Sequence, residues 1–294
     1  MQLARRQKLL LFKVSALLSL VRWYNIFFLA LSQYLTAIFI LNAPKDWIET
    51  LKNPNLHYIV FASLFCIAAG YLINNFYDVE KDLINRPERT IHQKIVRQST
   101  SLRLYFLFNF LGALLSLMVS LNVFLFFSFF IFALWFYSHK LKKITFLGNM
   151  VAALLAITPF FATFLYYHLE DLLVLTYISF LLLIIFIREI IKDLRTFKGD
   201  VITGYPTLPV QIGINRTKWL IFFFALLGLV PSFLIFYKTE FTGVSYYLSI
   251  GLALVFLSLI VLLKAQKVKH YSLLNNIYRF LIIGGIFSLI LFNR

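Results

Sequence analysis

Nine long apolar stretches dominate this sequence of 294 residues. They cover residues 23–41, 57–77, 102–119, 121–138, 146–167, 171–190, 217–237, 245–263 and 275–292. Each is long enough, or nearly so, to cross the hydrocarbon core of a bilayer as a helix. The chain is 61% hydrophobic and only 14% charged, which is more apolar than a soluble domain. We therefore predict an all-α, polytopic membrane protein with nine transmembrane helices in a single domain, residues 1–294, whose residues 1–22 form a basic interfacial lead-in.

The basic residues predict an orientation for these spans. Only four of the 28 Lys and Arg residues fall on one side of a nine-span topology, namely Lys45, Lys52, Lys238 and Arg294. Because Lys and Arg in short loops favour the cytoplasmic side, we expect a cytoplasmic N-terminus in the cell's cytoplasmic (inner) membrane. The net charge of +16 is explained by these loops and by anionic headgroups or substrates, so we expect membrane lipids and no nucleic acid as partners.

The acidic residues and the single cysteine exclude other classes. None of the 12 Asp and Glu residues falls in the middle of a predicted span, which argues against an ion or proton transporter. Cys66 is the only cysteine, so no intrachain disulfide can form. Its place within an apolar run predicts a small buried residue.

A first polar motif follows the second apolar run. Asn74, Asp78 and Asp82 are spaced i, i+4, i+8, so a continuing helix would present all three on one face. An amide and two carboxylates are ligands suited to a hard divalent cation. Carboxylates at a membrane boundary are costly unless they are paired or bound to metal. A solvated helix end with neutralising ion pairs is the simpler alternative.

A second acidic motif follows the sixth apolar run. Glu189, Asp193, Thr196 and Asp200 are spaced i, i+4, i+7, i+11, which is again one helical face. Gly199 is a candidate for the residue that ends this helix. Together, two such sets of oxygen ligands among basic residues suit a magnesium-bound diphosphate. Lys and Arg would bind the phosphate oxygens, and a diphosphate handled beside apolar helices implies a lipid tail.

The order of motifs resembles the UbiA superfamily of intramembrane prenyltransferases over nearly the whole chain. The matching residues are Arg22 and Asn25, Asn74 through Asp82 with Asn85-Arg86-Pro87, Tyr137 through Lys143 leading to Gly148-Asn149, and Arg188-Glu189 through Asp200 leading to Thr207-Leu208-Pro209. The resemblance implies nine helices around a central cavity open to lipid, and a cytoplasmic cap built from residues 78–101 and 188–216. It also implies two Mg²⁺ ions that bridge the acidic motifs to a prenyl diphosphate donor. After the diphosphate leaves, an acceptor captures the allylic cation.

The resemblance assigns roles residue by residue. The expected catalytic residues are Asp78, Asp82, Asp193 and Asp200, and the expected metal ligands are these four with Asn74 and Glu189. The expected substrate-binding residues are Arg22, Asn25, Asn74, Arg86, Arg89, Tyr137, Lys140, Lys142, Arg188 and Lys192. Two positions depart from the family pattern: Thr196 stands where a third Asp is usual, and Asn75 stands where many members have Asp.

The amino-acid sequences of these motifs are most similar to those of the ether-lipid branch of this family. That branch implies a geranylgeranyl-type donor and geranylgeranylglyceryl phosphate as the lipid acceptor. Two alternatives stay open. One is an aromatic prenyltransferase of quinone biosynthesis acting on 4-hydroxybenzoate or dihydroxynaphthoate. The other is a transporter or lipid-binding membrane protein without catalysis, which the missing third Asp would favour.

Overall fold

The computed structural model describes residues 5–41, 47–85, 95–167, 172–238 and 243–292, and these residues form helices and short connections without a strand. Nine helical segments in this described part are long and apolar enough to cross a membrane, as predicted. They are Trp23–Leu41, Pro54–Tyr77, Gln98–Val119, Leu121–Lys143, Leu147–Tyr167, Leu172–Ile202, Ile214–Tyr237, Gly243–Lys264 and Val268–Leu291. The all-α architecture inferred from the apolar pattern is therefore confirmed.

The chain divides into two compact units. Residues 1–30 and 57–139 form the first unit, and residues 31–56 and 140–294 form the second. The division falls inside α2 (Trp23–Thr36), which continues as the π-helical turn η1 (Ala37–Leu41).

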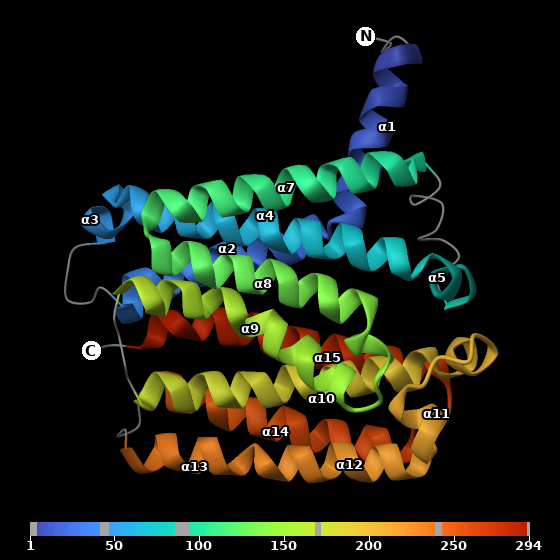
Figure 1. Cartoon of the computed structure of the whole chain (residues 1–294). Helices are drawn as coiled ribbons and strands as arrows, with labels where there is room; N and C mark the ends of the chain where they lie inside the picture. The colour runs from blue at the N-terminus through green and yellow to red at the C-terminus, as the bar shows by residue number, and fades with distance from the viewer. Residues whose placement is uncertain (1–4, 42–46, 86–94, 168–171, 239–242, 293–294) are drawn as a thin grey trace. The chain divides into compact units, whose positions relative to one another are not determined.

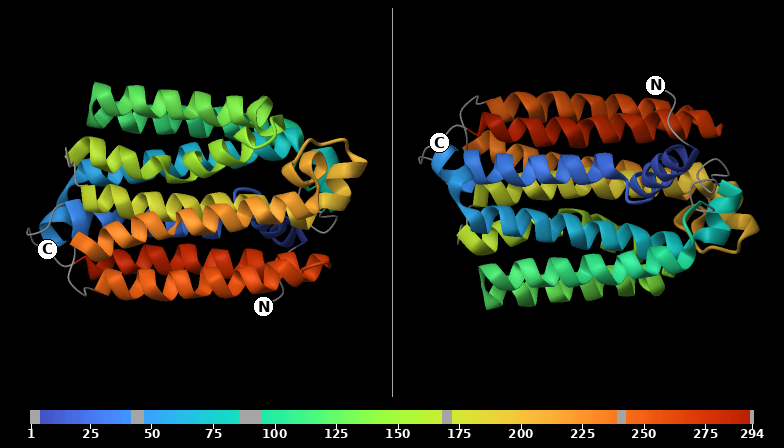
Figure 2. Two further views of the ribbon diagram at one scale, coloured as in Figure 1. Left: turned by 90° about the horizontal axis from the view of Figure 1, so that it is seen from below. Right: turned by 90° about the horizontal axis from the view of Figure 1, so that it is seen from above.

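The first unit contains α1 (Arg5–Leu20), the start of α2, most of α4 (Pro54–Tyr77), α5 (Val79–Asn85), α7 (Gln98–Val119) and α8 (Leu121–His139). Figure 1 shows α1 leaving α2 at a sharp angle, and Figure 2 shows α7 and α8 running side by side. Cys66 on α4 is fully buried, as predicted. A Cβ atom on Gly112 of α7 would lie 2.6 Å from the Cys66 sulfur, so α4 and α7 approach too closely for a larger residue there.

The second unit is built around one long helix, α10 (Leu172–Ile202), which packs against α9 (Leu147–Tyr167) and α15 (Val268–Ser288). Its other elements are α3 (Trp47–Lys52), η2 (Leu141–Lys143), α11 (Leu208–Ile212), α12 (Ile214–Leu227), α13 (Leu229–Lys238), α14 (Gly243–Lys264) and η3 (Leu289–Leu291). Helices α12 and α13 lie end to end and make one span (Figure 1). One buried amide of this unit bonds to backbone: the Gln33 side-chain amide donates to the Pro159 carbonyl at 2.8 Å, since an amide away from water is costly without a partner.

The sixth span differs from the sequence expectation at its end. Helix α10 continues through Gly199 to Ile202, so residues 188–202 of the expected cap segment are helical and extend the span. Gly199 is therefore not the end of the helix. A single buried glycine costs a helix only about 1 kcal/mol, which the packed neighbours offset. The turn is made instead at Gly204, whose φ of +63° is a conformation that glycine adopts readily.

Many large apolar side chains are exposed on these helices. Phe106, Phe110 and Phe129 of the first unit and Phe233 and Phe280 of the second are each more than 60% accessible. A soluble protein rarely exposes so many large apolar side chains, whereas a bilayer covers them. The surface therefore agrees with the nine-span assignment.

Candidate active site

The first acidic motif keeps helical geometry across the junction of α4 and α5. Asp78 joins the two helices, and its amide donates to the Asn74 carbonyl at 3.0 Å. The amide of Asp82 donates to the Asp78 carbonyl at 2.8 Å. These i to i−4 bonds preserve the spacing that places the three side chains on one face. The side-chain amide of Asn74 also donates to a carboxylate oxygen of Asp78 at 2.9 Å, so the structure brings these two predicted ligands together.

The junction of α1 and α2 contacts the helix that carries this motif. Arg22 lies in the turn between α1 and α2 with a φ of +54°, and its guanidinium carbon lies 4.9 Å from the centre of the Tyr71 ring. The Asn25 amide donates to the Tyr71 hydroxyl at 3.0 Å. The structure therefore brings together Arg22 and Asn25, two predicted substrate-binding residues, on Tyr71. Sequence reasoning missed Tyr71, although it lies three residues before Asn74 on the same helical face.

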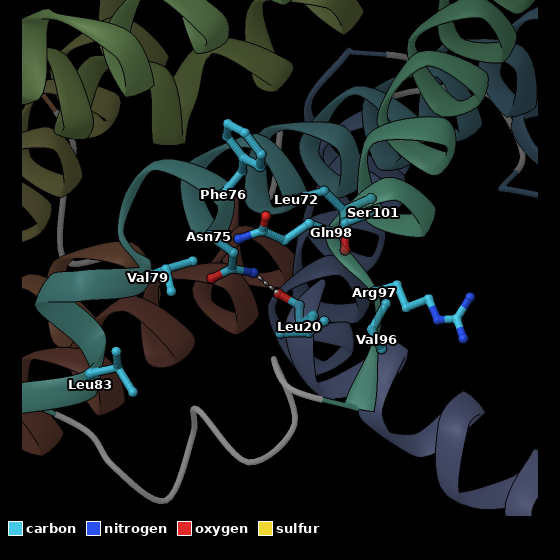
Figure 3. A pocket seen from close by; sticks show the side chains of 10 residues that line it. All are labelled: Leu20, Leu72, Asn75, Phe76, Val79, Leu83, Val96, Arg97, Gln98 and Ser101. Carbon is cyan, nitrogen blue, oxygen red and sulfur yellow. Dashed lines mark hydrogen bonds between the residues drawn. The ribbon is translucent and has the colours of Figure 1, made fainter.

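Asn75 has a different role from its neighbour. It is 8% exposed, and its amide donates to the backbone carbonyl of Leu20 at 3.0 Å (Figure 3). The bond lies in the wall of a cavity of about 250 Å³, which is also lined by Leu72, Phe76 and Gln98. Asn75, expected to stand where many members of the family have Asp, thus connects α4 to the end of α1.

The second acidic motif lies on the last turns of α10 within the second unit. Asp193 is 7% exposed and Asp200 is fully buried. The Asn149 amide of α9 donates to a carboxylate oxygen of Asp193 at 2.7 Å, and the Thr196 hydroxyl donates to a carboxylate oxygen of Asp200 at 2.9 Å. Each carboxylate is therefore oriented by a neutral donor. Sequence reasoning assigned Asn149 no role beyond the family resemblance, and no local spacing relates it to Asp193.

Glu189 contacts two basic side chains of its own helix. Its carboxylate forms ion pairs with Lys192, one turn later, and with Arg188 at 3.7 Å. These contacts bring together three of the predicted site residues. Its predicted role as a metal ligand stays a prediction.

The basic segment of residues 140–143, which includes η2, is held against the start of α9 by close backbone contacts. A Cβ atom on Gly148 would lie 3.0 Å from the Lys142 carbonyl, so η2 closes directly onto the start of α9. The Thr145 hydroxyl donates to the Pro206 carbonyl at 2.7 Å, which ties this segment to the turn after α10. Lys140 is exposed at the start of the segment.

The remaining predicted residues are placed only in part. Tyr137 is half-buried in the last turns of α8, in the first unit. Arg86 and Arg89 lie outside the described residues. No group of three or more His, Cys, Asp or Glu side chains gathers within metal-binding range in the described ranges. The possible ligand sets are instead mixed, with Asn74 beside Asp78 and Asn149 beside Asp193.

Comparison with known sequences identifies the family. A sequence model of the UbiA prenyltransferase family matches residues 30–279. A digeranylgeranylglyceryl phosphate synthase from Thermococcus gammatolerans is 34% identical over 215 residues, which are 71% of this chain and 76% of the relative. The synthase of the same name from Sulfurisphaera tokodaii is 29% identical over 88% of this chain and 92% of its own length. The chain belongs to the UbiA prenyltransferase family.

Solved structures share the fold. One described as giving insights into digeranylgeranylglyceryl phosphate synthase in membranes matches with a TM-score of 0.70 and 22% identity, covering 95% of this chain and 99% of the other. A UbiA homolog from Archaeoglobus fulgidus bound to DMAPP and Mg²⁺ matches with a TM-score of 0.66 and 15% identity, covering 93% and 98%. The chain is accordingly an integral, multi-pass membrane protein and, by family, a prenyltransferase.

Proposed function

We propose that this protein transfers a geranylgeranyl-type group from its diphosphate to geranylgeranylglyceryl phosphate, in a reaction that depends on Mg²⁺. The observation that carries the proposal is the 34% identity to a relative named for the synthesis of digeranylgeranylglyceryl phosphate. The Archaeoglobus fulgidus homolog bound to DMAPP and Mg²⁺ supports the class of donor and the metal.

The residues present fit Mg²⁺ by their chemistry. Asn74, Asp78 and Asp82 offer amide and carboxylate oxygens along one helical face, and Asp193 and Asp200 offer two more carboxylates. Mg²⁺ prefers oxygen ligands and commonly takes one or two carboxylates together with phosphate oxygens. When bound, the metal would neutralise charge that develops on the departing diphosphate.

The other polar residues would act on the donor directly. Arg22 and Arg188 carry planar guanidinium groups that suit bidentate contacts with phosphate oxygens, and Lys140, Lys142 and Lys192 add point charges. We propose the same phosphate-binding role for Arg86 and Arg89, and positioning of the donor by Asn25 and Tyr137. The apolar helices would exclude water from the allylic cation, so that the lipid acceptor captures it.

The location of the reaction is part of the proposal. The basic residues favour a cytoplasmic N-terminus and a reaction centre at the cytoplasmic face. The expected cap, formed from residues 78–101 and the segment 188–216, would cover this centre within a single catalytic domain of residues 1–294.

A reconstitution experiment tests the proposed function. Purified protein in detergent or liposomes is given labelled geranylgeranyl diphosphate, Mg²⁺ and either geranylgeranylglyceryl phosphate or 4-hydroxybenzoate. We expect product only with the lipid acceptor, and loss of at least 100-fold in rate for Asp78→Asn, for Asp193→Asn and on removal of Mg²⁺, because charge stabilisation by such groups contributes several kcal/mol. Product only with the aromatic acid would overturn the acceptor assignment. Full activity of both variants would overturn the roles of the two motifs.

A further inference from the structure

Helix α4 holds the junction of α1 and α2 at two points that are one turn apart. Tyr71 contacts the side chains of Arg22 and Asn25, through its ring and its hydroxyl respectively. Asn75 binds the backbone carbonyl of Leu20, on the other side of the turn. Figure 3 shows the Asn75 amide directed at Leu20. The junction is therefore fixed to α4 in both position and rotation.

The backbone at this junction is strained. Arg22 has a φ of +54°, in the left-handed region that non-glycine residues adopt at a cost of about 1 kcal/mol or more. Such a conformation persists only where the surrounding contacts determine it. Tyr71, Asn25 and Asn75 make polar or cation–π contacts among those that surround this turn.

The strained turn directs a guanidinium toward the face of α4 that carries the acidic motif. Tyr71, Asn74 and Asp78 are spaced i, i+3, i+7, so the ring beneath Arg22 lies on the same face one turn before Asn74. A free arginine side chain carries about 2 kcal/mol of rotamer entropy, and part of this is lost whenever it binds a ligand. An arginine held over an aromatic ring has lost much of that freedom before the ligand arrives.

We propose that Tyr71 and Asn75 are positioning residues for the donor substrate. They hold the α1–α2 junction so that the Arg22 guanidinium is oriented in advance for the diphosphate of the prenyl donor. This rests on the proposed function, since it assumes that Arg22 binds that diphosphate. Neither residue needs to touch the donor.

Direct binding measurements test this proposal. The dissociation constant of geranylgeranyl diphosphate with Mg²⁺ is measured on purified protein for Tyr71→Leu, Tyr71→Phe, Asn75→Ala, Arg22→Ala and the double variant Arg22→Ala with Tyr71→Leu. Tyr58→Leu is the matched control, because it removes a tyrosine from the same helix more than three turns before Tyr71. We expect Tyr71→Leu to weaken binding about tenfold, in the range of a partly desolvated cation–π contact. Tyr71→Phe, which keeps the ring, should lose less.

The double variant distinguishes an effect of Tyr71 that acts through Arg22 from an independent effect on donor binding. If Tyr71 acts through Arg22, its loss adds little once Arg22 is already Ala, whereas independent effects would multiply. In turnover assays, Tyr71→Leu and Asn75→Ala should raise KM for the donor more than they lower kcat. Wild-type binding by Tyr71→Leu, or full additivity with Arg22→Ala, would overturn the proposal while leaving the prenyl-transfer activity of the wild type intact. If Tyr71→Leu does not fold, unchanged donor binding by both Tyr71→Phe and Asn75→Ala would overturn it. Wild-type protein that neither binds nor consumes the donor would instead overturn the proposed function itself.

Discussion

The side-chain amide of Asn149 on α9 donates a hydrogen bond of 2.7 Å to Asp193 on α10. Both residues lie where their helices approach the same end of the second unit, and Asp193 is 7% exposed there. A carboxylate with so little contact with water depends on such donors to satisfy its oxygens and to fix its orientation. The bond gives Asn149 a role in the second acidic motif although it is distant in sequence.

Replacing Asn149 by Ala should impair prenyl transfer through Asp193. A hydrogen bond to a charged group contributes about 1.5–3 kcal/mol, so we expect kcat/KM to fall about tenfold to 100-fold. The Mg²⁺ concentration for half-maximal rate should rise as well, because the carboxylate is no longer held in place. Both quantities are measured on purified protein with labelled donor.

The matched control is Asn215→Ala. Asn215 is an exposed asparagine near the start of α12 in the same unit, so its removal should leave both quantities within about twofold of wild type. Wild-type Mg²⁺ dependence in Asn149→Ala would show that Asp193 does not need this donor.

Two substitutions of Thr196 should change the Mg²⁺ requirement in opposite directions. Its hydroxyl donates to Asp200 at 2.9 Å, and Asp200 is fully buried. Thr196→Val keeps the shape but removes the donor, so we expect lower thermal stability by about 1–3 kcal/mol and a higher Mg²⁺ requirement. Thr196→Asp places a second carboxylate beside Asp200, so it should destabilise the protein without Mg²⁺ and lower the Mg²⁺ concentration needed for half-maximal rate.

The control for Thr196 is Thr203, the residue directly after the end of α10. The Thr203 hydroxyl donates to the backbone carbonyls of Gly199 and Asp200, and not to a carboxylate. Thr203→Val should therefore leave the Mg²⁺ requirement unchanged. A titration in which Thr196→Asp needs as much Mg²⁺ as wild type would contradict a metal near Asp200.

The fold was predictable because few backbone structures satisfy their own hydrogen bonds within a bilayer. Apolar runs of this length must become helices, since lipid cannot satisfy exposed backbone groups. The motif spacing was equally informative, because the hydrogen bonds from Asp78 to Asn74 and from Asp82 to Asp78 keep the helical register that the sequence implied. The end of α10 was not predictable, since the sequence does not reveal that a buried Gly199 is tolerated within a packed helix.

Contacts between residues far apart in the chain could not be predicted from the sequence alone. Asn25 and Tyr71 are 46 residues apart, and Asn149 and Asp193 are 44 apart, so no local spacing relates them. The departures at Thr196 and Asn75 could be noticed in the sequence, but their roles could not be assigned. Only the structure shows that Thr196 donates to a carboxylate and that Asn75 binds a backbone carbonyl of α1.

Gly112→Ala should destabilise the packing of α7 on α4. A Cβ atom there would lie 2.6 Å from the Cys66 sulfur and 3.3 Å from the Ala62 carbonyl, and both neighbours are fully buried. Overpacking of this kind costs about 1–3 kcal/mol, which a thermal denaturation of the purified protein in detergent would register as a lower Tm. Adding Cys66→Ala removes the sulfur that the new methyl group would meet, so the double variant should recover part of the lost stability. Equal Tm values for Gly112→Ala and wild type would show that α4 and α7 separate easily, and no recovery in the double variant would place the clash at the Ala62 carbonyl instead.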